Sequence, residues 1–293
     1  MSSELGNTLN WFANQEEEVR EDYVRSAFPY PGSKAKCIEN IIPHLPYTDM
    51  YSEPFGGSGA ILLARNSSRL EIFNDRCSGV TAFFRVCRHK ENLDALITRL
   101  SILIHSREEF IWCKNEWKNS EDDVERAARW YYMVVCSFGS HMRNFGRSKD
   151  PKALFAPKLH NSLDFFYPLH DRIKNCQIEN LDWRQCFKDY DHSDMVWYID
   201  PPYYQTSGGM YENELLDSEH VQMLDMIQDL QGFVAISGYP NELYNSYKWD
   251  KIVSWEQNSS SLGIAFTGTN NLDKFKNQLQ RQKVTEVLWI KNF

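Results

Sequence analysis

Short apolar segments recur along this chain, and segments with helical periodicity lie between them. Apolar runs with polar ends indicate strands of a sheet covered on both faces, whereas apolar residues three and four positions apart indicate helices. Strands that alternate with helices predict an α/β fold with a doubly wound, mostly parallel sheet. The strand-like segments are residues 49–52, 70–74, 195–200, 233–237, 251–255 and 286–290, and the clearest helical patterns are residues 60–65, 78–90, 91–104, 121–135 and 218–228.

The alternation lapses between residues 136 and 176, where Gly, Ser, Asn, Pro, Lys, Arg and aromatic residues dominate. A long, loop-rich stretch within a compact domain is usually functional or disordered, and aromatic side chains favour order. We therefore expect an inserted element at residues 136–176, a main domain formed by residues 28–135 and 177–293, and an acidic lead-in at residues 1–27.

The charge of the chain argues against a protein that coats nucleic acid non-specifically. Its 32 Lys and Arg residues are outnumbered by 40 Asp and Glu residues, which gives a net charge of −8, whereas such binding depends on neutralising phosphates. Basic residues gather between Arg143 and Lys174 and again from Lys274 onward. Local basic segments on a negative body suit a discrete nucleic-acid site, and an ordinary solvated surface explains the charge equally well.

The cysteines and the first residues indicate an intracellular protein. The seven cysteines are never spaced as CxxC, so neither a disulfide framework nor a zinc site is indicated. The amino-terminal residues lack the basic stretch and apolar core of a secretory signal, and no apolar run is long enough to cross a bilayer. We expect a cytoplasmic protein with no metal ion and no membrane partner.

The most specific motif is an apolar strand that ends in Asp200-Pro201-Pro202-Tyr203. The two prolines stop the strand, because they fix φ and donate no backbone hydrogen bond. Asp200 is thereby displayed at the carboxyl edge of the sheet, where open α/β sheets bind ligands. The Asp200 carboxylate and the Pro201 carbonyl could accept hydrogen bonds from the exocyclic amine of a base during methylation, and Tyr203 could stack on a base that has left its helix. A strand-terminating turn with a structural acid is the alternative interpretation.

A second motif, EPFGGSG at residues 53–59, connects a strand to a helix. Glycines let the backbone approach a ligand closely, and the pattern differs from both the phosphate loop and the GxGxxG fingerprint. Asp75 ends the next strand, where an acid could bind the two ribose hydroxyls of a nucleoside. A glycine turn alone is weak evidence for a nucleoside-binding site, but Asp75 and Asp200 at the ends of other strands make that evidence strong.

A third motif, FPYPGSK at residues 28–34, is a turn that ends in a lysine. Lys34 could neutralise the carboxylate at the amino-acid end of a cofactor, and Tyr30 could pack on that cofactor. An ordinary turn explains this motif equally well.

Together, these motifs resemble the Dam-like family of N6-adenine DNA methyltransferases in the α arrangement. PYPGSK, EPFGGSG, FND and DPPY occur here in the order of that family, and the similarity continues in WYYMVVCSFGSHMRNFG, GGMY, ISGYPNELY and EVLWIKN. It extends over nearly the whole chain from Phe28 onward. The resemblance implies a Rossmann-like methyltransferase sheet, S-adenosyl-L-methionine as cofactor, and a target-recognition role for residues 136–176.

The resemblance also assigns roles to residues. Asp200, Pro201, Pro202 and Tyr203 would form the catalytic turn, with Asp200 between the cofactor and the target amine. Two departures are Tyr30, where the family often has Trp, and Ser140-His141, where it often has Gly or Asn. The implied cofactor contacts are Tyr30, Lys34, Glu53, Pro54, Phe55, Gly56, Gly57, Gly59, Asp75 and Asp200.

We expect double-stranded DNA to bind to residues 136–176, which are called the middle segment below. Arg can fork onto guanine and Asn onto adenine in the major groove, whereas Lys more often contacts phosphates. Candidate base or phosphate readers are Arg143, Asn144 and Arg147, and candidate phosphate contacts are Lys149, Lys152 and Lys158.

Other interpretations of the same motifs stay open. N4-cytosine methylation shares the chemistry, but its catalytic turn more often begins with Ser, so Asp200 favours adenine. An adenine flipped out of an RNA helix presents the same base to the pocket as one flipped out of DNA, so N6-adenine methylation of RNA is an alternative. A non-catalytic DNA-binding module is another alternative. A restriction endonuclease partner is not evident from the sequence.

Overall fold

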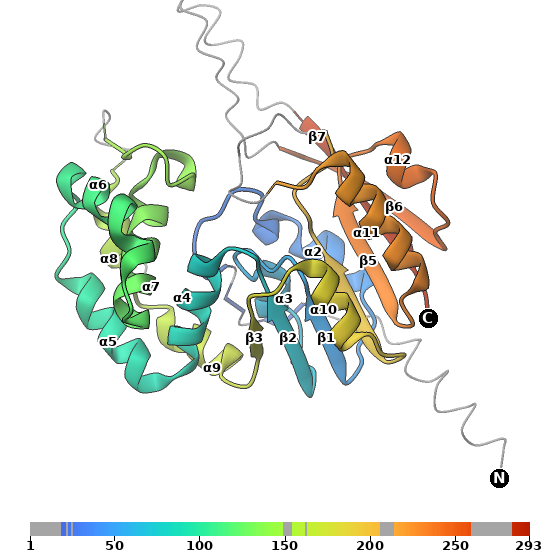
Figure 1. Ribbon diagram of the computed structural model, residues 1–293, viewed down its shortest axis with the longest axis horizontal. Coiled ribbons are helices and arrows are strands. Elements are labelled where there is room, and N and C mark those ends of the chain that lie inside the picture. Colours follow the sequence, from blue (N-terminus) through green and yellow to red (C-terminus); the bar gives the residue numbers. More distant parts are fainter. Residues whose placement is uncertain are drawn as a thin grey trace, which may run out of the picture.

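The computed structural model describes residues 19–21, 23–24, 26–148, 154–161, 163–205, 214–258 and 283–293. Within this part, the strands form one seven-stranded sheet in the order β3-β2-β1-β4-β5-β7-β6 (Figure 1). Strand β7 is antiparallel to both of its neighbours, and the other strands share one direction. The strands are β1 (Met50–Glu53), β2 (Leu70–Asn74), β3 (Gln177–Glu179), β4 (Met195–Ile199), β5 (Phe233–Gly238), β6 (Lys251–Asn258) and β7 (Lys283–Lys291).

The expected α/β class and mostly parallel, Rossmann-like sheet are confirmed. All six strands expected from the apolar runs are present, and their ends differ from the expected ones by at most three residues. Strand β3 was not expected, because Gln177-Ile178-Glu179 contains a single apolar residue and gives no apolar run. It pairs in parallel with β2 at the edge of the sheet.

Helices cover both faces of the sheet, as alternate residues of β4 show. Met195, Trp197 and Ile199 pack with α10 (Trp183–Tyr190), α11 (Asp217–Asp229) and α12 (Glu242–Asn245). Val196 and Tyr198 belong to the core on the opposite face, which includes α2 (Ile38–Ile41), α3 (Ala60–Ala64) and α4 (Ser78–Arg88). The period of two places successive side chains on opposite faces of a strand, so the doubly wound arrangement follows directly.

A group of helices lies beside the β3 edge of the sheet (Figure 1). The five expected helices correspond to α3, α4, α5, α7 and α11, whereas α6 and the short helices were not expected. The helices of this group are α5 (Lys90–Ser101), α6 (Arg107–Glu116), α7 (Asp123–Cys136), α8 (Ala156–Asn161) and α9 (Phe166–Ile173). Short 3₁₀ turns are η1 (Lys34–Lys36), η2 (Ile42–His44), η3 (Trp117–Asn119) and η4 (Phe138–Ser140).

Residues 136–176 contain two of these helices, although the sequence suggested an irregular element. Leu159 of α8 and Phe166, Leu169 and Ile173 of α9 are buried in the same core as α4 and α7. The segment therefore packs as one body with the helices that precede it. The boundaries of an inserted element at residues 136–176 remain a prediction.

A buried ion pair anchors α9 to the sheet. The Arg172 guanidinium donates to both carboxylate oxygens of Glu71 on β2, at 2.6 and 2.7 Å. Arg65 lies 3.7 Å from the same carboxylate, and all three side chains are buried. Arg172 is one of the basic residues expected to form a positive surface between Arg143 and Lys174, and its burial removes it from that surface.

The described residues show no group of three or more His, Cys, Asp or Glu side chains arranged to hold a metal ion. All seven cysteines are buried and free. No helix in the described ranges has the length and apolar character needed to cross a membrane.

We predict that Glu71→Ala lowers the free energy of unfolding by about 3–5 kcal/mol, because removing one partner leaves buried, uncompensated charge on the other. Urea denaturation measures this change. Glu256→Ala is the matched control, since Glu256 pairs with Lys283 with both side chains more than 60% exposed, and such pairs contribute about 0–1 kcal/mol. Equal effects of the two substitutions would contradict the role of the buried pair.

Candidate active site

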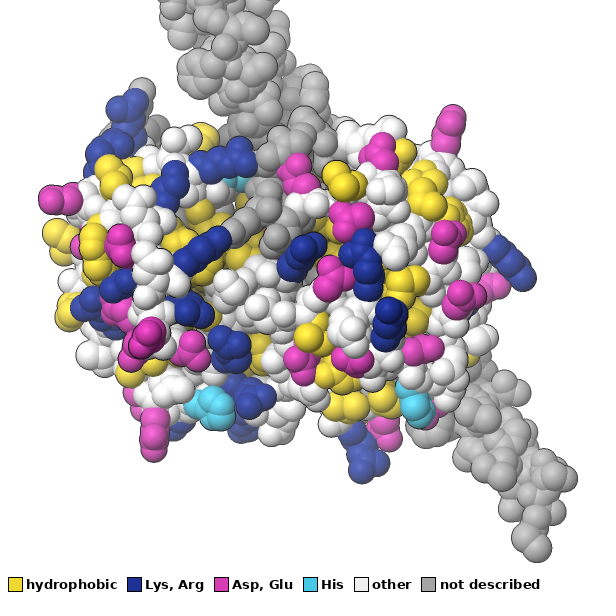
Figure 2. Space-filling model, viewed as in Figure 1, with side chains coloured by type: hydrophobic (Ala, Val, Ile, Leu, Met, Phe, Trp, Pro, Cys, Tyr) yellow, Lys and Arg dark blue, Asp and Glu magenta, His cyan; other side chains and the backbone are white. Residues whose placement is uncertain are grey.

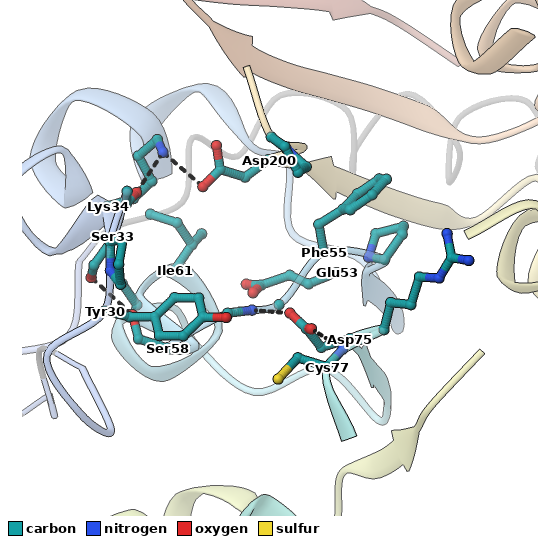
Figure 3. Close-up of a pocket in the computed structure, with 18 of the residues that line it drawn as sticks. Tyr30, Ser33, Lys34, Glu53, Phe55, Ser58, Ile61, Asp75, Cys77 and Asp200 are labelled. Carbon is teal, nitrogen blue, oxygen red and sulfur yellow. Dashed lines mark hydrogen bonds and ion pairs between the residues drawn. The ribbon is translucent and has the colours of Figure 1, made fainter. Parts of the chain in front are cut away.

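A cavity opens where the carboxyl ends of β1, β2 and β4 meet (Figure 3). Lys34 and Asp200 lie at one end of the view, Asp75 and Cys77 at the other, and Glu53 between them. The sheet topology brings these side chains together, because parallel strands end at the same edge. Of the expected cofactor contacts, those that line the cavity are Tyr30, Lys34, Glu53, Pro54, Phe55, Gly56, Gly57, Asp75 and Asp200.

The glycine turn after β1 supports one wall of the cavity. The Gly56 amide donates to the Asn74 carbonyl at 2.8 Å, and a Cβ at Gly56 would lie 2.2 Å from the Phe73 ring. Gly57 has φ +51°, a left-handed conformation that favours glycine. Gly59 does not line the cavity and instead is the N-cap of α3.

Asn74 and Asp75 connect this turn to the ends of β2 and β3. The buried Asn74 side chain donates to the Pro54 carbonyl at 2.8 Å and accepts from the Leu181 amide at 2.7 Å. The Asp75 carboxylate accepts from the amides of Gly57 at 2.8 Å and Cys77 at 2.7 Å. Burial raises the pKa of Asp75 to about 6, and these two N–H donors oppose the rise.

Glu53 is the second acid of the cavity wall. It is buried, and the Tyr51 hydroxyl donates to it at 2.7 Å. Burial raises the pKa of Glu53 to about 8, although the Tyr51 hydrogen bond and the charge of Arg65 lower it. Arg65 is 3.9 Å from the centre of the Tyr51 ring and 3.7 Å from the Glu71 carboxylate. Tyr51 and Arg65 therefore connect Glu53 to the buried ion pair of Glu71.

Lys34 and Asp200 form an ion pair across 166 residues of sequence, with Nζ 2.7 Å from Oδ2. The Lys34 side chain is only 6% exposed, and Nζ also donates to the Gly32 carbonyl at 2.7 Å. The sequence suggested a cofactor carboxylate as the partner of Lys34. In the structure, its charge is instead directed at Asp200, the acid at the end of β4.

The other oxygen of Asp200 is bound by a residue that sequence reasoning missed. Ser237 Oγ, at the end of β5, donates to Asp200 Oδ1 at 2.8 Å, and the Tyr198 hydroxyl lies 3.1 Å from the same Oγ. Ser237 is fully buried. Ser237 lies within the motif ISGYPNELY, but no spacing rule connects it to Asp200.

Within the turn that was expected to be catalytic, Pro202 lines the cavity, whereas Pro201 and Tyr203 do not. The Tyr203 hydroxyl donates to Glu286 of β7 at 2.6 Å, and its ring meets the Tyr239 ring edge to face at 4.7 Å. Lys34 Nζ lies 4.8 Å from the centre of the Tyr203 ring. Burial raises the pKa of Glu286. No sequence pattern predicts the Glu286 contact.

Two residues of the middle segment reach the cavity. His141 and Met142 line it, and Met142 has φ +57°. The Met142 amide donates to Ser137 Oγ at 3.0 Å. Further lining residues that the sequence did not single out for the site are Pro31, Gly32, Ser33, Ser58, Ala60, Ile61, Arg76, Cys77, Leu181, Trp183, Tyr198 and Leu215.

The candidate DNA contacts differ in their surroundings. Arg143, Asn144 and Arg147 are exposed, and Lys158 lies 4.1 Å from the centre of the Phe155 ring. Figure 2 shows basic side chains on the helical group and across the middle of the same face. Lys149, Lys152 and the GGMY motif lie outside the described residues.

Comparison with known families agrees with the motifs. The family model for D12 class N6 adenine-specific DNA methyltransferases matches residues 30–262. The match includes the glycine turn, Asp75, the middle segment and the catalytic turn. Comparison with individual curated proteins gives no match. Because the matched region is most of the chain, the protein belongs to the family of D12 class N6 adenine-specific DNA methyltransferases.

Proposed function

We propose that this adenine-specific DNA methyltransferase uses S-adenosyl-L-methionine and acts on an adenine flipped out of a specific sequence in double-stranded DNA. The observation that supports this best is a single cavity with Asp75 near one end and Asp200 near the other. One acid is suited to ribose hydroxyls and the other to an amine, so the cofactor and the target base have separate anchors.

The residues of the cavity fit this cofactor in charge and shape. Asp75 and Asp200 are acids, which suits a ligand that carries a sulfonium and an ammonium group, and the buried Glu53 carboxyl, with its pKa raised to about 8, offers a neutral oxygen acceptor. Both oxygens of Asp75 are held by backbone N–H groups and keep lone pairs for ribose hydroxyls. Apolar side chains of Phe55, Ile61, Leu181 and Trp183 complete the lining for the adenine ring.

The proposed reaction depends on accepting hydrogen bonds from the amine. When bound, S-adenosyl-L-methionine supplies an electrophilic methyl group. The N6 lone pair of adenine is delocalised into the ring, and hydrogen bonds from the amine to the Asp200 carboxylate and the Pro201 carbonyl would draw the nitrogen toward tetrahedral geometry. The N–C bond would then form as the bond from the methyl carbon to the sulfonium sulfur breaks, and the methylated amine would lose one proton to water. Lys34 and Ser237 hold one oxygen each of Asp200, so the carboxylate is already oriented.

Tyr203 has a structural partner in addition to its proposed contact with the base. Its hydroxyl is bound to Glu286 and its ring meets Tyr239. Lys34 Nζ, which pairs with Asp200, lies 4.8 Å from the centre of the Tyr203 ring, so Tyr203 is close to that ion pair. Base flipping enzymes commonly stack the extruded base on aromatic side chains. We assign Tyr203 to this stacking, with Glu286 as its anchor.

Methylation of adenine in RNA is the alternative to methylation of DNA. Matched DNA and RNA duplexes, compared as methyl acceptors, distinguish the two activities. The non-catalytic alternative is disfavoured because Lys34, Asp75 and Asp200 are all retained and all line one cavity.

We predict that Asp200→Asn reduces DNA methylation at least about 100-fold while the protein stays folded, because the variant loses the charged acceptor for the amine. Transfer of labelled methyl groups to unmethylated genomic DNA measures activity, and circular dichroism measures folding. Asp194→Asn, at an exposed acid just before β4, is the matched control and should keep full activity. A loss of less than about tenfold in Asp200→Asn would rule out the proposed role.

We predict that the affinity for S-adenosyl-L-methionine falls as the pH drops from 7 to 5. Asp75 has a pKa of about 6, so it is ionised at pH 7 and becomes protonated below pH 6, which removes an acceptor for the ribose hydroxyls. Calorimetry without DNA measures the affinity. Asp75→Asn should bind weakly at pH 7 and lose this pH dependence. An unchanged affinity in Asp75→Asn would show that the cofactor contacts lie elsewhere.

We predict that Arg143→Ala and Lys158→Ala weaken DNA recognition in different ways. A base reader contributes about 1–3 kcal/mol of discrimination at one position of the site, so Arg143→Ala should relax the methylated sequence. A phosphate contact is independent of sequence, so Lys158→Ala should weaken all binding and lower the salt slope by about 1. Sequencing of methylated sites and salt titrations measure these effects; an unaltered sequence and affinity in both variants would place recognition elsewhere.

A further inference from the structure

We propose that Ser237 is a positioning residue that fixes the orientation of the Asp200 carboxylate, with Tyr198 fixing Ser237 in turn. The inference rests on the proposed role of Asp200. Ser237 belongs to β5, which pairs with β4, the strand that ends at Asp200. It is fully buried and its hydroxyl donates to Asp200, so it is placed to act on the substrate through Asp200.

The direction of each hydrogen bond follows from the groups involved. An ionised carboxylate only accepts, so the single hydroxyl hydrogen of Ser237 goes to Asp200 Oδ1 at 2.8 Å rather than to the Ile199 carbonyl at 3.5 Å. The Tyr198 hydroxyl, 3.1 Å from Ser237 Oγ, must then be the donor in that contact. Burial raises the pKa of Tyr198 far above its usual value, which keeps its proton in place.

These contacts hold the carboxylate from two sides. Ser237 donates to Oδ1 from the sheet, and Lys34 donates to Oδ2 from the start of η1. Rotation of the carboxylate about its Cβ–Cγ bond would break both hydrogen bonds. Lone pairs that remain on Asp200 therefore face the cavity in one fixed direction, which is the geometry that an amine acceptor needs before the base arrives.

The first test is Ser237→Ala, with steady-state kinetics on an unmethylated DNA duplex that contains the sequence recognised by the enzyme. The turnover number kcat should fall roughly tenfold or more, since a hydrogen bond to a charged group is lost. The KM values for DNA and S-adenosyl-L-methionine should change less than about twofold, because Ser237 touches neither ligand. Tyr198→Phe should lower kcat less, since Ser237 still donates to Asp200 in that variant.

Two further variants separate the hydroxyl from simple packing. Ser237→Thr keeps the hydroxyl on a residue that suits a strand and should restore most of the wild-type kcat. Ser52→Ala is the matched control, because Ser52 is also fully buried, on β1, and does not contact Asp200; its kcat should stay at the wild-type value. If Ser237→Ala fails to fold, Ser237→Cys replaces it, and its weak S–H donor should give a kcat below that of Ser237→Thr.

The outcomes separate this inference from the proposed function. If Asp200→Asn is inactive while Ser237→Ala keeps the wild-type kcat, the positioning role is wrong and the catalytic role of Asp200 stands. A kcat of Ser237→Thr as low as that of Ser237→Ala would also overturn the inference, because packing rather than the hydroxyl would then matter. If Asp200→Asn stays active, the proposed role of Asp200 fails, and the positioning role fails with it.

Discussion

Three loops at the carboxyl edge of the sheet depend on the side chain of Asn74. Its amide donates to the carbonyls of Pro54 and Leu181, at 2.8 and 3.2 Å, and its oxygen accepts from the Leu181 amide. The segments that follow β1, β2 and β3 are thus joined through one buried residue. Because a buried polar group without a partner is costly, the glycine turn cannot move independently of Asp75, and the Gly57 amide is held where it reaches the Asp75 carboxylate at 2.8 Å.

The Lys34–Asp200 ion pair connects two segments in the same way at the other end of the cavity, where it joins the start of η1 to the end of β4. Two acids of the cavity, Glu53 and Asp75, differ in their protonation. Burial raises the pKa of Glu53 to about 8 and that of Asp75 to about 6, so at neutral pH Asp75 is ionised while Glu53 is largely protonated. The cavity thus avoids several unpaired negative charges side by side, which burial would penalise, and the ionised Asp75 would still suit the cationic cofactor proposed above.

The sequence predicted those parts of the site that follow from local pattern. Apolar runs end where the sheet ends, so Asp75 and Asp200 could be placed together from strand positions alone, and the glycine turn with them. Strand β3 gave no such run, and the helices α8 and α9 lay in a stretch dominated by turn-forming residues. The contacts of Ser237 with Asp200 and of Glu286 with Tyr203 were not predicted, because they join residues 37 and 83 positions apart. Such contacts depend on which strands are neighbours, and β7 enters the sheet between β5 and β6.

The middle segment illustrates how charge in a sequence divides between structure and surface. Arg172 is buried and donates to Glu71, whereas Arg143 and Arg147 are exposed. The loop that carries Arg143 is shaped by local contacts: the Phe138 amide donates to the Asn144 carbonyl at 2.9 Å, and the Gly146 amide to the Cys136 carbonyl at 2.7 Å. Ser140 and Met142 hold positive φ angles within it, a costly conformation that persists only where surrounding contacts impose it. A loop held by such contacts would lose little conformational entropy on binding. Since His141 and Met142 also line the cavity, DNA bound at Arg143, as proposed above, would contact a loop that forms part of the cavity wall.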